Sequence, residues 1–284
     1  TNCGPRYSII QQLPYDRIHT AMDSIEMCTE CNNEYNQTEN RRYYSQTNSC
    51  PSCAITLSLF GKNGEVISKD NTEIIEQLVQ LWKEGKIIAI KGIGGYLLSC
   101  DAENEATIEQ LRQRKHRPSK PFALMFPKIE SLEKEETISD KEIAELQSHV
   151  APIVLCNLKS DSTTNLKRKV IAPELQQIGA MLPYTPLFDL LLKKFEKPIV
   201  ATSGNISNSS IIFEDEKALN ELPTIADYIL VNNREIVVPQ DDSVVKFSFF
   251  KKQKIIIRRS RGMAPSFKLP KLRMPSKPIF AAGA

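Results

Sequence analysis

A cluster of cations beyond a predicted helix is the part of the sequence best suited to chemistry. The helix is expected over residues 104–115, and Pro118 ends it. The cations at and after the helix end are Lys115, Arg117 and Lys120. Cations held between a helix and the next strand, expected at 121–125, suit a phosphate or a carboxylate better than they suit a core. A solvated, basic helix end is the competing interpretation.

Further polar groups follow other predicted strands. Lys91 ends a strand at 87–90, before glycines that would let the backbone approach a ligand. Ser203 and Asn205 follow an apolar run at 198–202. The run from Asp241 to Ser243 precedes a strand near Val244, and Arg258 to Gly262 follow another, which adds the candidates Ser243, Arg259 and Arg261. Because open α/β sheets bind ligands at strand ends, these groups predict an anion pocket. A plain turn at 203–205 and surface cations elsewhere are the alternatives.

Two cysteine pairs have the spacing of a zinc ribbon. They are Cys28 with Cys31 and Cys50 with Cys53, a C-x2-C…C-x2-C pattern. Four thiolates complete a tetrahedral shell around one Zn²⁺, which leaves no open position, so the metal would be structural. Disulfides and a redox pair are the competing interpretations. Cys100 and Cys156 lie in apolar runs and are expected to be buried thiols.

Alternation of helices and strands sets the fold class. Beyond the elements above, we expect helices at 73–83, 186–195 and 215–222, and strands at 153–156, 199–202 and 228–231. This order predicts an α/β fold, a twisted mixed sheet with flanking helices. Residues 1–60 lack apolar periodicity and would form a small zinc-finger region that needs metal to fold. The main domain is expected over 65–268, and 269–284 would be a linker and the start of another module.

Composition limits the class of protein. The chain has 284 residues, 41% of them hydrophobic and 25% charged, which are ordinary globular values. A net charge of +3 is too small to argue for nucleic acid. No apolar run approaches the ~20 residues that span a bilayer, and no signal peptide is visible, so a cytoplasmic location is expected. The acidic run 130–145 is interpreted as a solvated helix face or loop.

Several motifs together resemble one family. In chain order they are KGIGGYLLSCDA, LRQRKHRPSKPFALM, GAMLPYTPL, TSGNIS, DDSVV and RRSRGMAP, and they resemble the YrdC-like domain of the HypF carbamoyltransferases of [NiFe]-hydrogenase maturation. The stretch before them, with TNCGPRYSII, LPYDR and the cysteine pairs, resembles the zinc-finger region of HypF. Cys3 would belong to an earlier finger, and we assign it no metal. The resemblance covers nearly the whole chain.

The resemblance implies carbamoyl-AMP synthesis. In that family ATP reacts with carbamate, which derives from carbamoyl phosphate, and pyrophosphate leaves. Another module then passes the carbamoyl group to the C-terminal cysteine of a HypE partner. Lys115 and Arg117 would grip the reacting groups. The supporting ATP- and carbamate-binding residues would be Lys91, Lys120, Ser203, Asn205, Ser243 and Arg259 or Arg261. Mg²⁺ is expected with ATP, and Asp241 and Asp242 are its candidate ligands, with a structural cap as the alternative.

Departures from the family pattern bear on activity rather than on fold. Phe188 and Asn232 stand where His is common, and Pro239-Gln240 stand where an Arg is usual. Two rival functions stay open. One is a threonylcarbamoyl-AMP synthase of tRNA modification, and the other is a zinc-ribbon module that binds RNA. Stacking on RNA needs aromatic side chains, and Tyr43-Tyr44 is the one pair that the sequence suggests is exposed.

Overall fold

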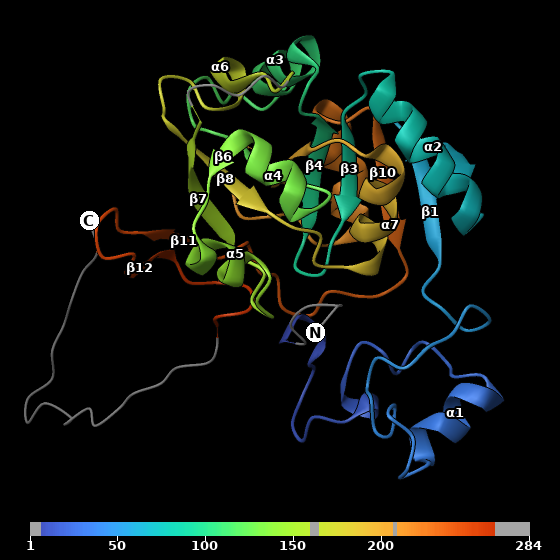
Figure 1. The fold of residues 1–284 in the computed structure, drawn as a ribbon. Coiled ribbons are helices and arrows are strands. Elements are labelled where there is room, and N and C mark those ends of the chain that lie inside the picture. The colour runs from blue at the N-terminus through green and yellow to red at the C-terminus, as the bar shows by residue number, and fades with distance from the viewer. Residues whose placement is uncertain (1–6, 160–164, 207–208, 265–284) are drawn as a thin grey trace, which may run out of the picture.

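One mixed sheet organises the chain, and helices flank it, as predicted (Figure 1). The computed structural model describes residues 7–159, 165–206 and 209–264. The strands are β1 (Leu57–Gly61), β2 (Val66–Ser68), β3 (Ile88–Lys91), β4 (Tyr96–Asp101), β5 (Ala123–Met125), β6 (Glu136–Thr137), β7 (Ile153–Leu158), β8 (Gln177–Met181), β9 (Ile199–Ser203), β10 (Tyr228–Asn232), β11 (Val244–Phe247) and β12 (Lys254–Arg258). Their order across the sheet is β12-β11-β7-β8-β5-β9-β4-β3-β10-β1-β2, and β6 pairs with β7.

Helices lie on both faces of this sheet, and one more, α1, lies in the segment before β1 (Figure 1). They are α1 (Thr29–Asn36), α2 (Asn71–Lys83), α3 (Glu105–Arg114), α4 (Ile129–Glu135), α5 (Asp140–Leu146), α6 (Arg168–Ile171), α7 (Pro186–Phe195) and α8 (Asp215–Glu221). Side chains of α2 and α7 share one core with the sheet, and side chains of α3 to α6 and α8 share the other. Among the helices of the described residues, none has the length and apolar character that a bilayer crossing requires.

Local sequence explains the helices that were predicted well. Asp70 caps α2 by accepting hydrogen bonds from the backbone N–H groups of Thr72 and Glu73, at 2.9 and 2.8 Å. Helix α7 begins with Pro186 at its first position, after Thr185 as N-cap, and ends before Glu196, whose φ is +61°. The helix therefore has the bounds that the sequence predicted.

Two buried strands, β4 and β8, are among the elements that the sequence analysis missed. Strand β4 is buried along all six residues, and β8 is buried along its last four. A strand buried on both faces has no apolar–polar alternation, so its sequence does not show the period of two. The glycines between β3 and β4 also differ from expectation. A Cβ on Gly94 would lie 2.3 Å from the backbone oxygen of Gln240, and one on Gly95 would lie 2.5 Å from Ile211. They leave room for other parts of the protein itself, the backbone of Gln240 and the side chain of Ile211.

The acidic run at 130–145 is not uniformly solvated, so that prediction was wrong for three of its members. Glu135, Glu136 and Glu142 are buried. Glu142 accepts from the backbone and hydroxyl of Ser139 at the start of α5, and Glu135 pairs with Arg168 at 3.1 Å. Both carboxylate oxygens of Glu136 are buried without a hydrogen-bond partner.

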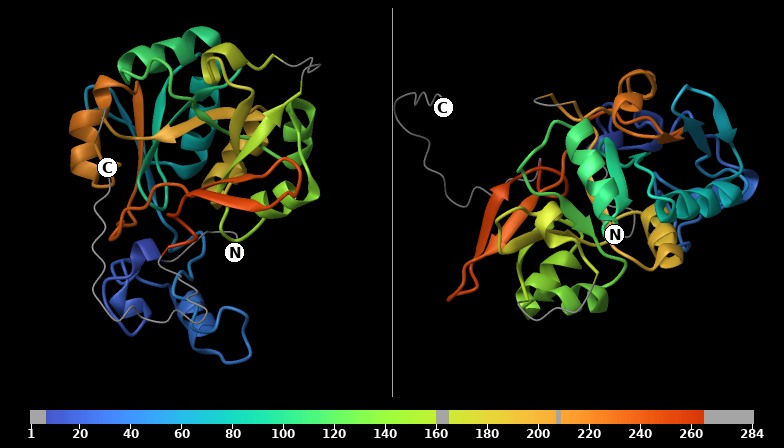
Figure 2. Two further views of the ribbon diagram at one scale, coloured as in Figure 1. Left: turned by 90° about the vertical axis from the view of Figure 1, so that its left-hand side faces the viewer. Right: turned by 90° about the horizontal axis from the view of Figure 1, so that it is seen from above.

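The segment before β1 forms a separate lobe that is fastened to the main sheet (Figures 1 and 2). Inside the lobe, the buried Arg17 donates to the carbonyls of Gln46, Asn48 and Ile25. The backbone oxygen of Ser8 accepts from Val237, at 2.7 Å, and from Val238. This contact joins the lobe to the connection between β10 and β11. Cys3 and the predicted linker 269–284 lie outside the described residues.

Candidate functional site

Lys115 is the C-cap of α3, and its side chain reaches the end of β9. The buried Nζ donates to the backbone oxygens of Ser203 (2.7 Å) and Asn205 (2.9 Å) and to Asn205 Oδ1 (2.8 Å). Burial, together with the nearby Arg117 and Lys120, lowers the pKa of Lys115 to about 8. The structure thus joins the predicted helix-end cations to the predicted Ser203–Asn205 turn.

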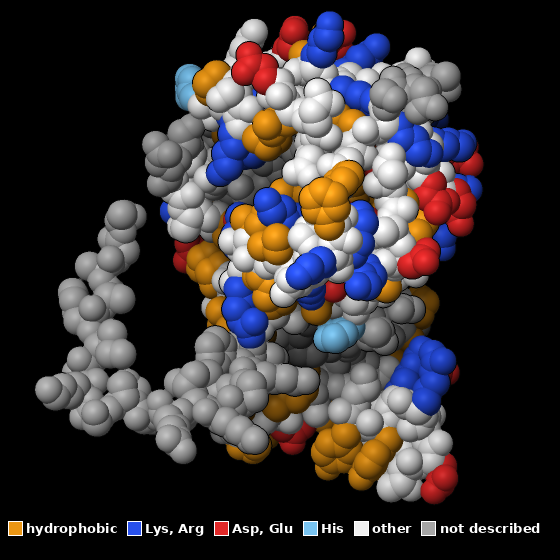
Figure 3. Space-filling model, turned by 60° about the vertical axis from the view of Figure 1, so that its left-hand side comes forward, with side chains coloured by type: hydrophobic (Ala, Val, Ile, Leu, Met, Phe, Trp, Pro, Cys, Tyr) orange, Lys and Arg blue, Asp and Glu red, His pale blue; other side chains and the backbone are white. Residues whose placement is uncertain are grey.

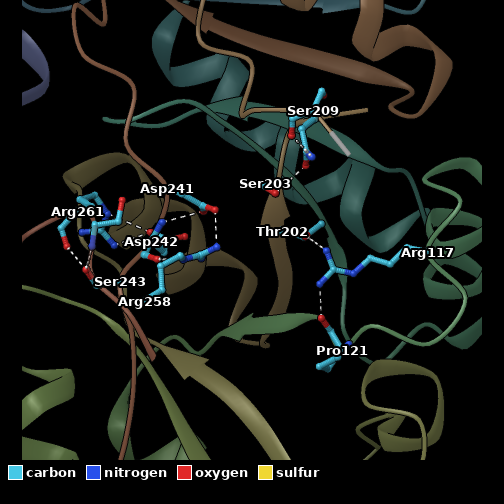
Figure 4. A network of polar contacts seen from close by, with 12 residues as sticks. Arg117, Pro121, Thr202, Ser203, Ser209, Asp241, Asp242, Ser243, Arg258 and Arg261 are labelled. Atoms are coloured by element: carbon cyan, nitrogen blue, oxygen red, sulfur yellow. Dashed lines mark hydrogen bonds and ion pairs between the residues drawn. The ribbon is translucent and has the colours of Figure 1, made fainter. Parts of the chain in front are cut away.

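Arg117 lies at the same strand end (Figure 4). Its guanidinium donates to Thr202 Oγ1 at 3.2 Å and to the backbone oxygens of Lys120 and Pro121, and it lies 5.0 Å from the ring centroid of Phe122. Burial is the main cause that lowers its pKa to about 10. Beside Pro121 is a cavity of about 410 Å³ whose lining has no charged side chain: Pro121, Leu155, Asn157, Leu175, Gln176, Gln177 and Gly179.

Arg112 holds the cationic segment in place, and the sequence analysis did not single it out. Its guanidinium donates to the backbone oxygens of Arg117 (2.8 Å), Pro118 (3.4 Å) and Lys120 (3.0 Å). It also donates to Val170 (2.6 Å) and Ile171 (2.9 Å) around α6. One rigid guanidinium therefore ties the segment 117–120 to a second element.

An ion pair, made by a residue just before β11 and the last residue of β12, faces these cations. Arg258 Nη1 lies 2.5 Å from Asp241 Oδ2, and its Nε donates to the Asp242 carbonyl at 2.6 Å. Burial raises the pKa of Asp241, while Arg258 opposes that rise. Asp241 influences the pKa of both Lys115 and Arg117, and Arg258 that of Arg117, so the two groups lie within electrostatic range of each other. Figure 4 shows Asp241 and Arg258 on one side of the site and Arg117 and Thr202 on the other.

The other predicted residues of this region have different surroundings. Ser243 is fully buried, donates to the Arg261 carbonyl at 2.8 Å and accepts from Ser260 N–H. Arg261 is buried too, pairs with Asp242 at 2.7 Å and stacks on Tyr184 at 3.8 Å. These two residues brace the strand ends from the interior. Lys120 and Arg259 are exposed, and Lys120 lies near enough to affect the pKa of Lys115 and Asp241.

Lys91 is engaged in a different cluster. Its buried Nζ lies 2.6 Å from Asp215 Oδ1 and donates to the Asn232 carbonyl at 3.0 Å, and Tyr96 donates to the same carboxylate. Asn232, one of the departures from the family pattern, donates back to the Lys91 carbonyl. A cavity of about 380 Å³ adjoins this cluster and has mostly acidic polar residues. Lys91 therefore forms an ion pair with the first residue of α8.

The two other departures have structural surroundings. Phe188 is buried in the core beside Tyr184, with ring centroids 5.4 Å apart. Pro239 is exposed, while Gln240 is buried and donates its backbone N–H to Gly94 at 2.8 Å.

The four cysteines fit a tetrahedral metal. Their sulfurs all lie within 4.8 Å of one another. Sulfur–sulfur distances are 3.5 Å for Cys28–Cys50, 3.8 Å for Cys50–Cys53 and 3.6 Å for Cys31–Cys53. Four ligands at about 2.3 Å around one zinc ion would place the sulfurs about 3.8 Å apart. Backbone N–H groups of Ser52 and Cys53 lower the pKa of Cys50 to about 6, which favours a thiolate ligand.

Comparisons with known proteins agree with this architecture. Residues 80–260 match the Sua5/YciO/YrdC family model, described as telomere recombination, and residues 27–60 match the HypF finger. The chain is 45% identical to carbamoyltransferase HypF of Synechocystis over 95% of its length and 39% identical to that of Rhodobacter capsulatus over 93%. It spans about a third of the length of these relatives, 35% and 34%.

Solved structures give the same result. The T. kodakarensis HypF structure superposes with a TM-score of 0.86 at 38% identity, over 93% of this chain and 34% of that one. Full-length HypF in a phosphate- and nucleotide-bound form gives 0.84 at 41% identity, over 93% and 33%. A threonylcarbamoyl-AMP synthase of Riesia pediculicola is 26% identical over 49% of this chain and 75% of its own length. The chain therefore belongs to the Sua5/YciO/YrdC family and is homologous to the HypF carbamoyltransferases over their finger and YrdC-like segment.

Proposed function

We propose that the site at the end of β9 forms carbamoyl-AMP from ATP and carbamate. The observation that carries the proposal is the convergence of Lys115 and Arg117 on that strand end, opposite Arg258 and Asp241. Similarity to HypF carbamoyltransferases, one of them crystallised with nucleotide and phosphate, supports the same assignment.

The reaction is a displacement at the α-phosphorus. A carbamate oxygen forms the new P–O bond, the bond to the β-phosphate oxygen breaks, and pyrophosphate leaves with the electron pair. Negative charge spreads over the phosphate oxygens in the transition state, so fixed cations and N–H donors supply most of the rate enhancement. Arg117 and Lys120 would meet the phosphates, and Arg258 would approach them from the other side if it exchanged Asp241 for a phosphate oxygen.

Lys115 would act through the turn that it holds. Its ammonium already donates to Ser203 and Asn205, so it fixes the turn and adds charge beneath it. Ser203 and Asn205 would then hydrogen-bond a phosphate or the carbamoyl group. The uncharged cavity beside Pro121, with amide side chains at its wall, is large enough for the nucleobase. Ser243 and Arg261 would keep this arrangement rigid from behind.

ATP would enter as its magnesium complex. Asp241 and Asp242 are each bonded to an arginine, so they do not fit the role of magnesium ligands in this arrangement, and we derive no step through such a site. The cysteine cluster fits a structural zinc ion held by Cys28, Cys31, Cys50 and Cys53. Transfer of the carbamoyl group to a HypE-like acceptor would be the step that follows adenylate formation.

The test is ATP-dependent pyrophosphate release with bicarbonate plus ammonium as the carbamate source. Arg117→Ala should reduce the rate roughly 100-fold, since it removes a charge-stabilising donor. Arg114→Ala is the matched control, because Arg114 belongs to the same cationic run but pairs with Asp227 at 2.8 Å. Release that requires threonine instead would assign the chain to threonylcarbamoyl-AMP synthesis. Equal rates of pyrophosphate release for Arg117→Ala and Arg114→Ala would show that Arg117 does not take part in the reaction.

A further inference from the structure

The hairpin of β11 and β12 ends the sheet and projects from it (Figures 1 and 2). Its turn is internally bonded: Ser248 N–H donates to the Gln253 carbonyl at 2.9 Å, Lys252 N–H donates to Ser248, and Gln253 N–H donates to Ser248 Oγ. Strand β12 pairs with β11 on one side. Within the described residues no strand pairs with its other side.

Apolar side chains are unusually exposed along this hairpin. Phe249 and Phe250 at the turn are 73% and 92% exposed, and their rings pack edge to face at 5.1 Å. Ile255, Ile256 and Ile257 on β12 are 40%, 47% and 52% exposed, although successive residues point to opposite faces of the strand. Long apolar edge strands invite pairing with another chain, and natural proteins normally cover or shorten them.

The charge around these side chains is positive. The hairpin, residues 244–258, contains five cations and no acidic residue: Lys246, Lys251, Lys252, Lys254 and Arg258. Three carboxylates outside it contact three of them, Glu142 with Lys252, Glu145 with Lys254 and Asp241 with Arg258. The hairpin therefore keeps a positive excess. Figure 3 shows a face on which hydrophobic and basic side chains gather together.

We propose that the outer edge of β12 is a docking site for a second protein, which adds an extended segment that is apolar in its middle and acidic at its ends. Backbone hydrogen bonds to the free edge would supply affinity, the exposed isoleucines would supply apolar contact, and the hairpin's positive excess would favour acidic ends. The five residues of β12 offer an edge about 17 Å long.

Charge and side-chain type favour this occupant over three others. A second copy would bring another hairpin with the same positive excess against the first, and like charges that face each other destabilise a sheet. Single-stranded RNA would need aromatic platforms along the strand, where β12 has isoleucines. An anionic membrane would account for Phe249 and Phe250 but not for an unpaired strand edge.

Binding of probe peptides tests the proposal. One labelled peptide carries alternating Val and Thr with two Glu at each end, and its match carries Lys in place of each Glu. We expect the Glu-ended peptide to bind at least tenfold more tightly in fluorescence anisotropy, with amide shifts in NMR spectra concentrated at 254–258. Phe250→Ser with Ile257→Thr should weaken it at least tenfold without changing the melting temperature, because both side chains are exposed. Lys251→Glu should reduce the ratio of the affinity for the Glu-ended peptide to the affinity for the Lys-ended peptide.

Several outcomes would overturn the proposal. Equal affinity for the two peptides, no binding of either, or binding unaffected by the double variant would each do so. Binding of a uridine oligonucleotide or of phosphatidylserine vesicles that depends on Phe250 and Ile257 would reassign the surface to those partners. A dimer in sedimentation velocity that the same variant dissociates would reassign it to a second copy.

Discussion

Replacing Glu136 by Gln should stabilise the protein at neutral pH, by an amount that grows with pH. Glu136 is 1% exposed, neither carboxylate oxygen has a hydrogen-bond partner, and burial raises its pKa to about 9. Its usual pKa is 4.5. Between these two values the folded protein holds a proton that the unfolded chain has lost, so stability falls as pH rises, by up to about 1.4 kcal/mol per pH unit.

The magnitude follows from the same two values. From pH 4.5 to pH 7 the accumulated cost is about 3 kcal/mol, and this is an upper figure because Glu135 and Glu142 are close enough to share it. Gln removes the ionisation but replaces the unpartnered carboxyl by an amide, whose additional unpaired N–H costs about 1–3 kcal/mol. We therefore expect a net gain of about 1 kcal/mol at pH 7, and a loss of similar size near pH 5.

Urea unfolding at pH 5, 7 and 8.5 measures this difference. Fluorescence of Trp82, the single tryptophan and fully buried in the core, reports the transition. Glu133→Gln is the control, since Glu133 is exposed in the same acidic run and its change should leave stability the same at each pH. A stability difference for Glu136→Gln that does not vary with pH would refute the reasoning.

Three further predictions concern the site and the finger. Arg112→Lys should raise the KM for ATP and lower the free energy of unfolding by about 2 kcal/mol, because one ammonium cannot span the five carbonyls that the guanidinium joins; activity assays and urea unfolding check the two effects. Lys91→Met should destabilise the protein by roughly 1–2 kcal/mol by leaving Asp215 without its cation, while the KM for ATP stays unchanged; a raised KM would place Lys91 in the nucleotide site after all. Cys31→Ser, or a zinc chelator, should remove the metal, speed amide hydrogen exchange in α1 and lower the melting temperature. Cys100→Ser, which changes a buried thiol outside the cluster, should leave the metal content unchanged.

Much of the site could be predicted because it is encoded locally. Pro118 and the helix before it place Lys115 and Arg117 at a strand–helix junction, and the run ending at Thr202 places Ser203 and Asn205 at a strand end. The contacts of Lys115 with that turn join the two predictions. The C-x2-C pairs likewise encode their own clustering, since each pair is one tight turn.

Other features depend on register, which local sequence does not encode. The sequence indicated Arg259 or Arg261 near the phosphates, yet Arg258 is the arginine that meets Asp241. A register shift between Val244 and Val245 changes which residues of β12 face that strand, and a shift of one residue moves every side chain to the other face. Lys91 shows the same limit. It ends a strand, as predicted, but its side chain pairs with Asp215 of α8 and does not reach the site at the end of β9.

The place of β10 in the sheet has a consequence for how the protein is made. β10 lies between β3 and β1 and pairs with both, in parallel with β3 and antiparallel with β1. Residues 57–61 can therefore join the remainder of the sheet only after residues 228–232 have been synthesised. When synthesis has reached the end of α8, the edges of β1 and β3 that β10 will join, and the edge of β7 that β11 will join, are still unpaired. Chains that terminate in that interval would expose these strand edges, so we expect them to aggregate or to depend on chaperones.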